Sequence, residues 1–447
     1  MMLPNFIDCM ASNTSTHTTM APRKLNGMIL RDHRFKLPLD YTRPHGETIE
    51  VFAREVCLRE KDDDKDLPWM IFFQGGPGFA SPRPSLNSGW IGEVLKSHRL
   101  LLLDDRGTGL SARILPQSLA GFSTPGEQAD YLVHFRADNI VRDAEAIREV
   151  LLGPDTQWKG IGQSYGGFCL LTYLSLHPES LSGVIITGGV AGIKRKIDDI
   201  YRLTYQRVIE KNEGYYSRYP EDEELAKRIV THLAGNEIFL PGGARLTPRR
   251  LQQLGLPLGM SDGRETLHYL LETAFIEGSD GPELSFDFLK AVENQTSYET
   301  NPIFCLLHEA VYAEGYATQW AAERLREEFP KVGIEGSDRF VFTGEMIAPS
   351  MLDDYFELTS LKECAEILAE KADWAPLYDL DRLSKNEVPV AAISYYGDMY
   401  VPIELSDETA RHIPRFNLWV TNEWEHDGIR ADGARIVARL LEMLHED

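Results

Sequence analysis

The sequence predicts an α/β protein in which a mostly parallel sheet is wrapped by helices and a large helical cap domain is inserted between strands. Short apolar runs of strand length alternate with stretches of helical spacing in residues 26–190 and again after residue 370. Residues 191–370 lack this alternation and are charged, aromatic and helix-like in their pattern. No apolar run reaches the roughly 18–20 residues that a membrane-spanning helix needs, so we expect no membrane contact.

The amino-acid composition and the net charge limit the kinds of molecule that this protein is expected to bind. The 447 residues are 43% hydrophobic and 26% charged, which is typical of a globular protein and argues against wholesale disorder. The formal net charge of −23 repels phosphate backbones, so we expect no nucleic-acid partner. The five cysteines are odd in number and show no CxxC spacing. We therefore expect reduced thiols, no metal, no cofactor and a cytoplasmic location.

We divide the chain into four segments. Residues 1–25 are polar and lack a basic head followed by an apolar core, which predicts a disordered lead rather than a signal peptide. Residues 26–190 and 371–447 form the two parts of the core, and 191–370 form the cap. A cap of this size would cover the carboxyl ends of the strands, where α/β sheets bind their ligands.

The two core segments contain predicted strands and helices that can be assigned one after another along the chain. Residues 32–56 predict short strands around a turn at 43–46, where proline and glycine interrupt the pattern. Later strands are apolar runs that end in short turns, and two helices have apolar residues at helical spacing. The strands are expected at 69–73, 100–103, 158–162, 181–186, 389–396 and 416–420, and the helices at 139–152 and 164–176.

A serine lies where one strand turns into a helix. The sequence Gly162-Gln163-Ser164-Tyr165-Gly166 fits G-x-S-x-G, with an apolar strand before it and a helix after it. The small residues at its two ends let the strand and helix backbones approach each other. The turn places the serine hydroxyl at a helix N-terminus, whose partial positive charge favours a developing anion. We predict that Ser164 is a nucleophile.

A serine nucleophile needs a base, and the base needs a carboxylate that orients it. The strand at 389–396 is followed by Asp398, and the strand at 416–420 is followed by His426. This order of serine, acid and histidine matches the order of a known strand-end triad. We therefore predict Asp398 as the acid and His426 as the base. Three other acids have less favourable placement: Asp353, Asp354 and Asp379.

A glycine-rich loop at 74–78 follows the strand at 69–73. Glycines expose a backbone N–H with no side chain in the way, so the loop suits the stabilisation of an oxyanion. We predict that the N–H groups of Gly76, chosen over Gly75, and of Tyr165 form this oxyanion hole. The loop lacks G-x-G-x-x-G spacing and is therefore not a dinucleotide-binding turn.

Taken together, these segments resemble the proline iminopeptidases (prolyl aminopeptidases), which are serine peptidases of the α/β-hydrolase fold. The resemblance is strongest to the longer members with a large cap. Many relatives have a histidine where Gln74 stands, but glutamine is compatible with a hole made by the backbone. The matching segments are 74–78, 104–109, 162–167, 397–398 and 425–426, with 301–312 and 342–346 in the cap.

The resemblance implies a metal-free serine exopeptidase that releases an N-terminal proline from a peptide through an acyl-enzyme. Such a substrate carries a secondary ammonium, which a pocket would bind with carboxylates and apolar walls. Glu309 and Glu345, in the matching cap segments, are the candidates. Weaker candidates are Glu213, Glu221 and Asp222. Two alternatives stay open: an esterase or amidase of a small metabolite with the same triad, and a non-catalytic binding protein of the same fold.

Overall fold

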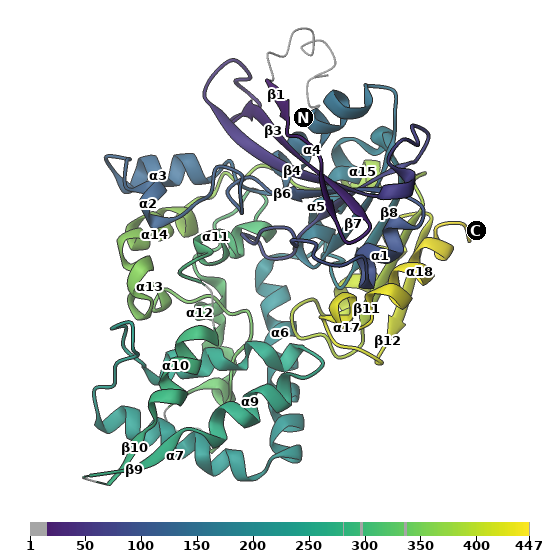
Figure 1. The fold of residues 1–447 in the computed structure, drawn as a ribbon. Helices are drawn as coiled ribbons and strands as arrows, with labels where there is room; N and C mark the ends of the chain where they lie inside the picture. The colour runs from purple at the N-terminus through teal and green to yellow at the C-terminus, as the bar shows by residue number, and fades with distance from the viewer. Residues whose placement is uncertain (1–15, 280, 296–297, 335–337, 447) are drawn as a thin grey trace.

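A ten-stranded sheet forms the centre of the computed structural model, which describes residues 16–279, 281–295, 298–334 and 338–446 (Figure 1). Its strands are β1 (His17–Thr19), β2 (Arg23–Leu25), β3 (Met28–Pro38), β4 (Thr48–Leu58), β5 (Trp69–Phe73), β6 (Arg99–Asp104), β7 (Trp158–Gln163), β8 (Leu181–Thr187), β11 (Val390–Tyr395) and β12 (Phe416–Thr421). Their order is β1-β3-β4-β6-β5-β7-β8-β11-β12, with β2 beside β3. All neighbours from β6 to β12 run parallel, which confirms the predicted fold class.

Successive residues of the central strands face two separate apolar cores, as the two-residue period of a strand requires. In β6, Leu101 and Leu103 pack on the side of α4 (Ala137–Leu152) and α5 (Tyr165–Leu176). Leu100 and Leu102 pack on the side of α1 (Gly89–Leu95) and α18 (Gly433–Met443). Every residue of β6 is buried. Helices therefore cover both faces of the sheet, and the strands are apolar throughout rather than alternating.

Other α-helices lie in the segments that connect or follow the strands of the core. They are α2 (Pro116–Leu119), α3 (Pro125–Leu132), α15 (Leu380–Leu383), α16 (Ile403–His412) and α17 (Gly428–Ala431). Because the strands are parallel, their carboxyl ends meet at one edge of the sheet. The turns after β5, β7, β11 and β12 at this edge carry Gly75, Ser164, Asp398 and His426 respectively.

Between β8 and β11 the chain leaves the sheet and forms a mainly helical lobe, drawn in teal and green at the lower left of Figure 1. Its α-helices are α6 (Ile197–Arg218), α7 (Glu221–Gly235), α8 (Pro248–Gln252), α9 (Gly263–Glu272), α10 (Phe286–Gln295), α11 (Pro302–Leu307), α12 (Ala321–Leu325), α13 (Met351–Asp354) and α14 (Lys362–Glu370). An antiparallel hairpin of β9 (Phe275–Gly278) and β10 (Gly281–Leu284) departs from the predicted helical pattern. The cap boundaries at 191 and 370 stay predictions.

The N-terminal segment differs from its prediction. Residues 1–15 of the expected disordered lead lie outside the described residues, but β1 and β2 fall within 16–25. Both strands pair antiparallel with β3. They supply hydrogen-bond partners to the outer edge of β3, and threonine at 18 and 19 favours extended backbone. Their residues are mostly exposed, so no apolar alternation marked them in the sequence.

The described chain offers no helix with both the length and the apolar character required to cross a bilayer. Four cysteines fall within the described ranges, and all four are buried and unpaired. They are Cys57, Cys169, Cys305 and Cys364. Cys9 lies outside the described residues.

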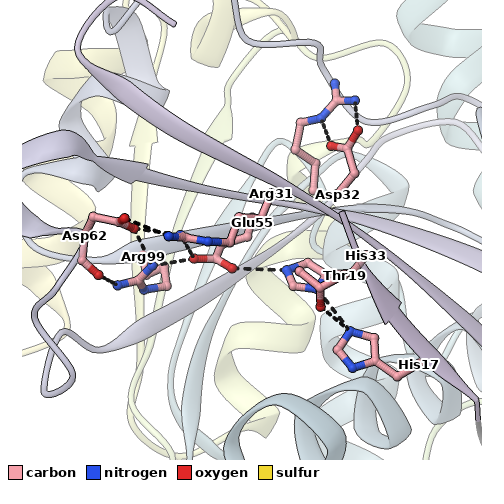
Figure 2. Close-up of polar contacts among 9 residues, drawn as sticks. His17, Thr19, Arg31, Asp32, His33, Glu55, Asp62 and Arg99 are labelled. Carbon is pink, nitrogen blue, oxygen red and sulfur yellow. Dashed lines mark hydrogen bonds and ion pairs between the residues drawn. The ribbon is translucent and has the colours of Figure 1, made fainter. Parts of the chain in front are cut away.

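A buried ionic network ties β1, β3, β4 and β6 together, and Figure 2 shows it in close-up. Glu55 on β4 lies at its centre with 5% of its surface exposed. Its carboxylate accepts hydrogen bonds from Arg31 at 2.9 Å, from His33 at 3.1 Å and from Arg99. His33 in turn contacts His17 of β1 at 3.1 Å, so the network reaches the edge of the sheet.

We expect Glu55→Gln to lower the free energy of unfolding by about 2–4 kcal/mol at pH 7, because it removes the closer of the two carboxylates that pair with the buried guanidinium of Arg99 and leaves only Asp62, at 3.5 Å. Burial raises the pKa of Glu55, but His33 and Arg99 lower it by more, so its pKa lies below the ordinary value. Its contribution is therefore present above about pH 4.3 and is lost as the pH falls through the pKa of the folded state.

Denaturant titration of both proteins at several pH values measures this difference. Glu50→Gln is the matched control, because Glu50 lies on the same strand and pairs with Arg34 while 45% of its side chain is exposed. We expect the control to change the free energy of unfolding by about 0–1 kcal/mol. Equal effects of the two substitutions would show that Glu55 is not a structural anchor.

Candidate active site

Ser164 occupies the sharp turn between β7 and α5. Its backbone has φ 54° and ψ −124°, in the positive-φ region that side chains rarely adopt. The flanking glycines permit this turn: a Cβ on Gly162 would lie 2.4 Å from the carbonyl of Gly166, and a Cβ on Gly166 would lie 2.1 Å from the carbonyl oxygen of Phe73. The strand, the turn and the helix therefore have the geometry of a nucleophile elbow, and 9% of Ser164 remains exposed.

The glycine-rich loop after β5 lies directly against this serine. A Cβ on Gly75 would lie 3.0 Å from the Cβ of Ser164, and Gly76 has a φ of 145°. Tyr165 is the first residue of α5, so its N–H belongs to the four that have no partner within the helix. Donation by Gly76 and Tyr165 to an oxyanion stays a prediction.

Asp398 and His426 meet at the same edge of the sheet. One carboxylate oxygen of Asp398 lies 2.6 Å from Nδ1 of His426, and the other accepts N–H bonds from Tyr400 at 2.8 Å and Val401 at 3.1 Å. The exposed fractions of Asp398 and His426 are 1% and 5%. The aspartate is thus held by the backbone of its own loop and holds the imidazole in turn.

The three alternative acids are occupied elsewhere. Asp353 forms an ion pair with Lys362. Asp354 accepts a hydrogen bond from Thr247 at 3.1 Å, and Asp379 caps helix α15. Of these four aspartates, Asp398 is the one that contacts His426 in the described residues.

Two successive glycines separate Ser164 from His426. A Cβ on Gly189 would lie 2.0 Å from the carbonyl oxygen of Ser164, and a Cβ on Gly188 would lie 3.3 Å from Nδ1 of His426. Gly188 has a φ of 58°. The serine backbone and the imidazole thus both lie against the turn after β8, on neighbouring residues of that turn.

Burial lowers the pKa of His426, but the charges on Asp398 and Glu345 raise it by more, so the pKa of His426 lies above its ordinary value. The ring also makes an edge contact with Tyr400, with 4.7 Å between the ring centroids. Its backbone N–H donates to the carbonyl oxygen of Gly259 in the cap at 3.1 Å. A buried imidazole beside a carboxylate is suited to accept and return a proton near neutral pH.

Glu345 lies close to this pair. Burial raises the pKa of its carboxyl to about 7; His426 lowers this pKa and Asp398 raises it. A Cβ on Gly344 would lie 2.5 Å from Cε of Met399, so the backbone before Glu345 packs on the loop that follows Asp398. Its charge also adds to burial in raising the pKa of the tyrosines around it, which are Tyr201, Tyr298, Tyr312 and Tyr400.

Glu309 is placed differently from Glu345. Its two carboxylate oxygens accept N–H bonds from Ala321 and Ala322, each at 3.0 Å, at the start of α12. This carboxylate therefore caps a helix, and substrate binding by Glu309 stays a prediction. The weaker candidates also have other environments: Glu213 pairs with Lys331, Glu221 begins α7, and Asp222 accepts bonds from Tyr215 and His268.

Sequence reasoning missed the pairing of Lys211 with Glu425, although both residues lie beside the predicted triad. Lys211 of α6 donates to Glu425 at 2.5 Å, and Glu425 directly precedes His426. A single lysine in a charged helix carries no motif, so no pattern in one sequence marks it. Across the described ranges, no three His, Cys, Asp or Glu side chains are grouped so as to hold a metal ion.

A mostly parallel sheet, a serine at positive φ between strand and helix, and a buried His–Asp pair at the same edge define an α/β hydrolase. A family model described as the alpha/beta hydrolase fold matches residues 68–230. A proline iminopeptidase of Aeromonas sobria is 51% identical over 420 residues, covering 94% of this chain and 97% of the relative. The proline iminopeptidase aneH of Aspergillus aculeatus is 37% identical over 425 residues, covering 93% of each chain. The chain belongs to the proline iminopeptidase family.

Among solved structures, a proline iminopeptidase of Mycobacterium smegmatis aligns with a TM-score of 0.44 and 14% identity, covering 92% of this chain and 97% of that one.

Proposed function

We propose that this enzyme is a serine exopeptidase that releases proline from the N-terminus of peptides. The observation that carries the proposal is the position of Glu345, a carboxylate with a pKa of about 7 within electrostatic reach of the His426–Asp398 pair. A carboxylate at this place would bind a positive charge next to the bond that is cleaved. The names of the two relatives with high coverage support the same substrate.

In the proposed reaction, Oγ of Ser164 attacks the carbonyl carbon of the prolyl residue while Nε2 of His426 takes the hydroxyl proton. Asp398 holds the Nδ1–H of the imidazole and stabilises its positive charge. The N–H groups of Tyr165 and Gly76 donate to the oxyanion. The C–N bond then breaks as the imidazolium gives its proton to the leaving amine, which produces a prolyl ester of Ser164.

Water completes the cycle. His426 removes a proton from a water molecule, whose oxygen attacks the ester carbonyl and forms a second tetrahedral intermediate. This intermediate collapses as His426 returns the proton to Oγ of Ser164, and free proline leaves. Throughout, Glu345 accepts hydrogen bonds from the secondary ammonium of the substrate, which offsets the cost of removing that charge from water.

A panel of four substrates tests the proposal: prolyl-arylamide, alanyl-arylamide, N-acetyl-prolyl-arylamide and a small uncharged ester. We expect prolyl-arylamide to have the highest kcat/KM of the three arylamides. N-acetylation removes the positive charge, so the acetylated compound should be a poor substrate. If it is cleaved as fast as the free amine, or if only the ester is cleaved, an esterase or amidase is the better assignment.

We expect Glu345→Gln to lower kcat/KM for prolyl-arylamide by about 10–100-fold, because it preserves shape but removes the charge that pairs with the ammonium. Cleavage of the uncharged ester should change far less, since that substrate never uses the contact. Steady-state kinetics on both substrates measure the difference.

Glu309→Gln is the companion variant. Its expected result is a lower melting temperature, because Glu309 caps helix α12, with a smaller loss of kcat/KM for prolyl-arylamide than Glu345→Gln shows. A loss of prolyl-arylamide cleavage in this variant alone would show that Glu309, and not Glu345, binds the ammonium of the substrate. Wild-type kinetics in both variants would show that neither carboxylate binds the substrate.

We also propose a cytoplasmic location. The support is that the four cysteines in the described ranges are buried and unpaired, which is usual for proteins of a reducing compartment.

A further inference from the structure

Lys211 on helix α6 of the cap is buried, and its side chain reaches the loops that carry Asp398 and His426. Only 8% of the Lys211 side chain is exposed, and its Nζ donates to Oε1 of Glu425 at 2.5 Å. Glu425 directly precedes His426 in the turn after β12. A lysine is rarely buried unless it is paired, so this contact determines where the end of the side chain lies.

The same ammonium also lies beside the loop that carries the acid. A Cβ on Gly397, the residue before Asp398, would lie 3.3 Å from Nζ of Lys211 and 3.7 Å from Oε2 of Glu425. The ion pair therefore fills the space between the loop of Asp398 and the loop of His426. A side chain at position 397 would crowd the pair.

Neighbouring positions of α6 contact the segment that leads to Glu345. The side-chain amide of Asn212 donates to the carbonyl of Phe342 and accepts from its N–H, both at 2.8 Å. A Cβ on Gly344 would lie 3.4 Å from Cγ2 of Val208. Residues 208, 211 and 212 lie on one face of a helix. This one face therefore touches the acid loop, the base loop and the segment that carries Glu345.

We propose that Lys211 and Glu425 are positioning residues whose ion pair fastens the cap to the loops of Asp398 and His426. Neither residue is assigned a contact with the substrate. The pair acts through His426, which it holds in line with Ser164. The inference rests on the proposed function for the role of the triad, but the geometry of the pair itself is independent of which substrate is cleaved.

The electrostatics of Glu425 explain why the pair matters. Burial and the charge on Asp398 raise the pKa of Glu425 by more than Lys211 and Arg264 lower it. The pKa of Glu425 therefore lies above its ordinary value. Its Oε2 atom is buried and has no hydrogen-bond partner within the described part of the chain. Without the lysine, this carboxylate would take up a proton or turn toward water, and the adjoining His426 would move with it. A displacement of about 1 Å in a catalytic group can cost on the order of 100-fold in rate.

The test measures the reaction of Ser164 with a fluorophosphonate probe, which needs the triad but not an N-terminal proline. In the full chain, we expect Lys211→Met and Glu425→Gln each to lower the labelling rate by about 10–100-fold. We expect kcat for prolyl-arylamide to fall by the same factor while KM changes less. The double variant should be no slower than the slower single variant, because both substitutions break one interaction.

Arg207→Met is the matched control. Arg207 lies one turn earlier on α6 and pairs with Glu404 of α16, so it also joins the cap to the core, but through a helix rather than through the residues next to Asp398 and His426. We expect this variant to be labelled at nearly the wild-type rate. If Lys211→Met does not fold, Glu425→Gln gives the same comparison.

Wild-type labelling of a folded Lys211→Met or Glu425→Gln variant would overturn the inference. Losses that multiply in the double variant would also overturn it, since they would show two independent effects. A wild-type protein that reacts with the probe but does not cleave prolyl-arylamide would contradict the proposed function and leave the role of the pair to be decided by labelling alone.

Discussion

Ser164→Ala should lower kcat/KM for prolyl-arylamide by at least about 1,000-fold and abolish fluorophosphonate labelling. The substitution removes the oxygen that forms the acyl-enzyme, and the residual rate comes from whatever binding and oxyanion stabilisation remain. The fold should survive, because the change deletes one atom at a turn whose geometry the surrounding glycines permit. Steady-state kinetics and thermal unfolding measure the two effects.

Ser175→Ala is the control for this variant. Ser175 lies on the same helix, and its buried hydroxyl donates to the carbonyl of Leu171 at 3.1 Å. We expect near-normal kinetics from it, with a modest loss of stability. Activity of Ser164→Ala above one-tenth of the wild type would rule out Ser164 as the nucleophile.

His426→Gln should produce the second large loss, again about 1,000-fold or more, because glutamine cannot take the proton from the serine hydroxyl. The wild-type rate should fall in acid as His426 becomes protonated. Since the net effect of its surroundings raises the pKa of His426, this fall should have its midpoint above pH 6.5. A pH profile of kcat for the ester isolates this limb, and the variant should lack it.

The two substrates should differ in the shape of the acid limb. Prolyl-arylamide needs both a neutral His426 and an ionised Glu345, whose pKa is about 7. Its log(kcat/KM) should therefore approach a slope of 2 in acid, whereas the uncharged ester should show a slope of 1. Glu345→Gln should reduce the slope for prolyl-arylamide to 1. His412→Gln, at a half-buried site at the end of α16, serves as the control for loss of an imidazole and should keep the full profile.

The strand ends of the core were predictable because two local signals coincide there. An apolar run marks a buried parallel strand, and glycine or acidic residues mark the turn that follows it, as at Ser164–Gly166 and at Gly397–Asp398. Once the strands are parallel, their ends must meet. The proximity of Asp398 and His426 follows from this topology rather than from any pairwise motif, and their 2.6 Å contact agrees with the expectation.

The cap was less predictable because its contacts join residues far apart in the sequence. Nothing in the sequence distinguishes the roles of Glu309 and Glu345. In the structure, Glu309 caps α12 and Glu345 lies beside the pair of His426 and Asp398. The partner of Lys211 is more than 200 residues away. The hairpin of β9 and β10 has mostly exposed residues, so it shows no buried alternation that would distinguish it from a loop.

The two-sided core of the sheet has a consequence for synthesis. Helix α18, the last helix described, covers the face that α1 begins, and a Cβ on Gly433 would lie only 2.7 Å from the Cβ of Trp90. A nascent chain that has emerged from the ribosome only as far as α14 already contains the serine elbow. It lacks Asp398 and His426, and the Trp90 side of its sheet is still uncovered. At that length the polypeptide has the serine but neither the acid nor the base, and the apolar residues beside Trp90 are exposed to other chains. His426 and α18 then follow within one short segment, residues 426–443.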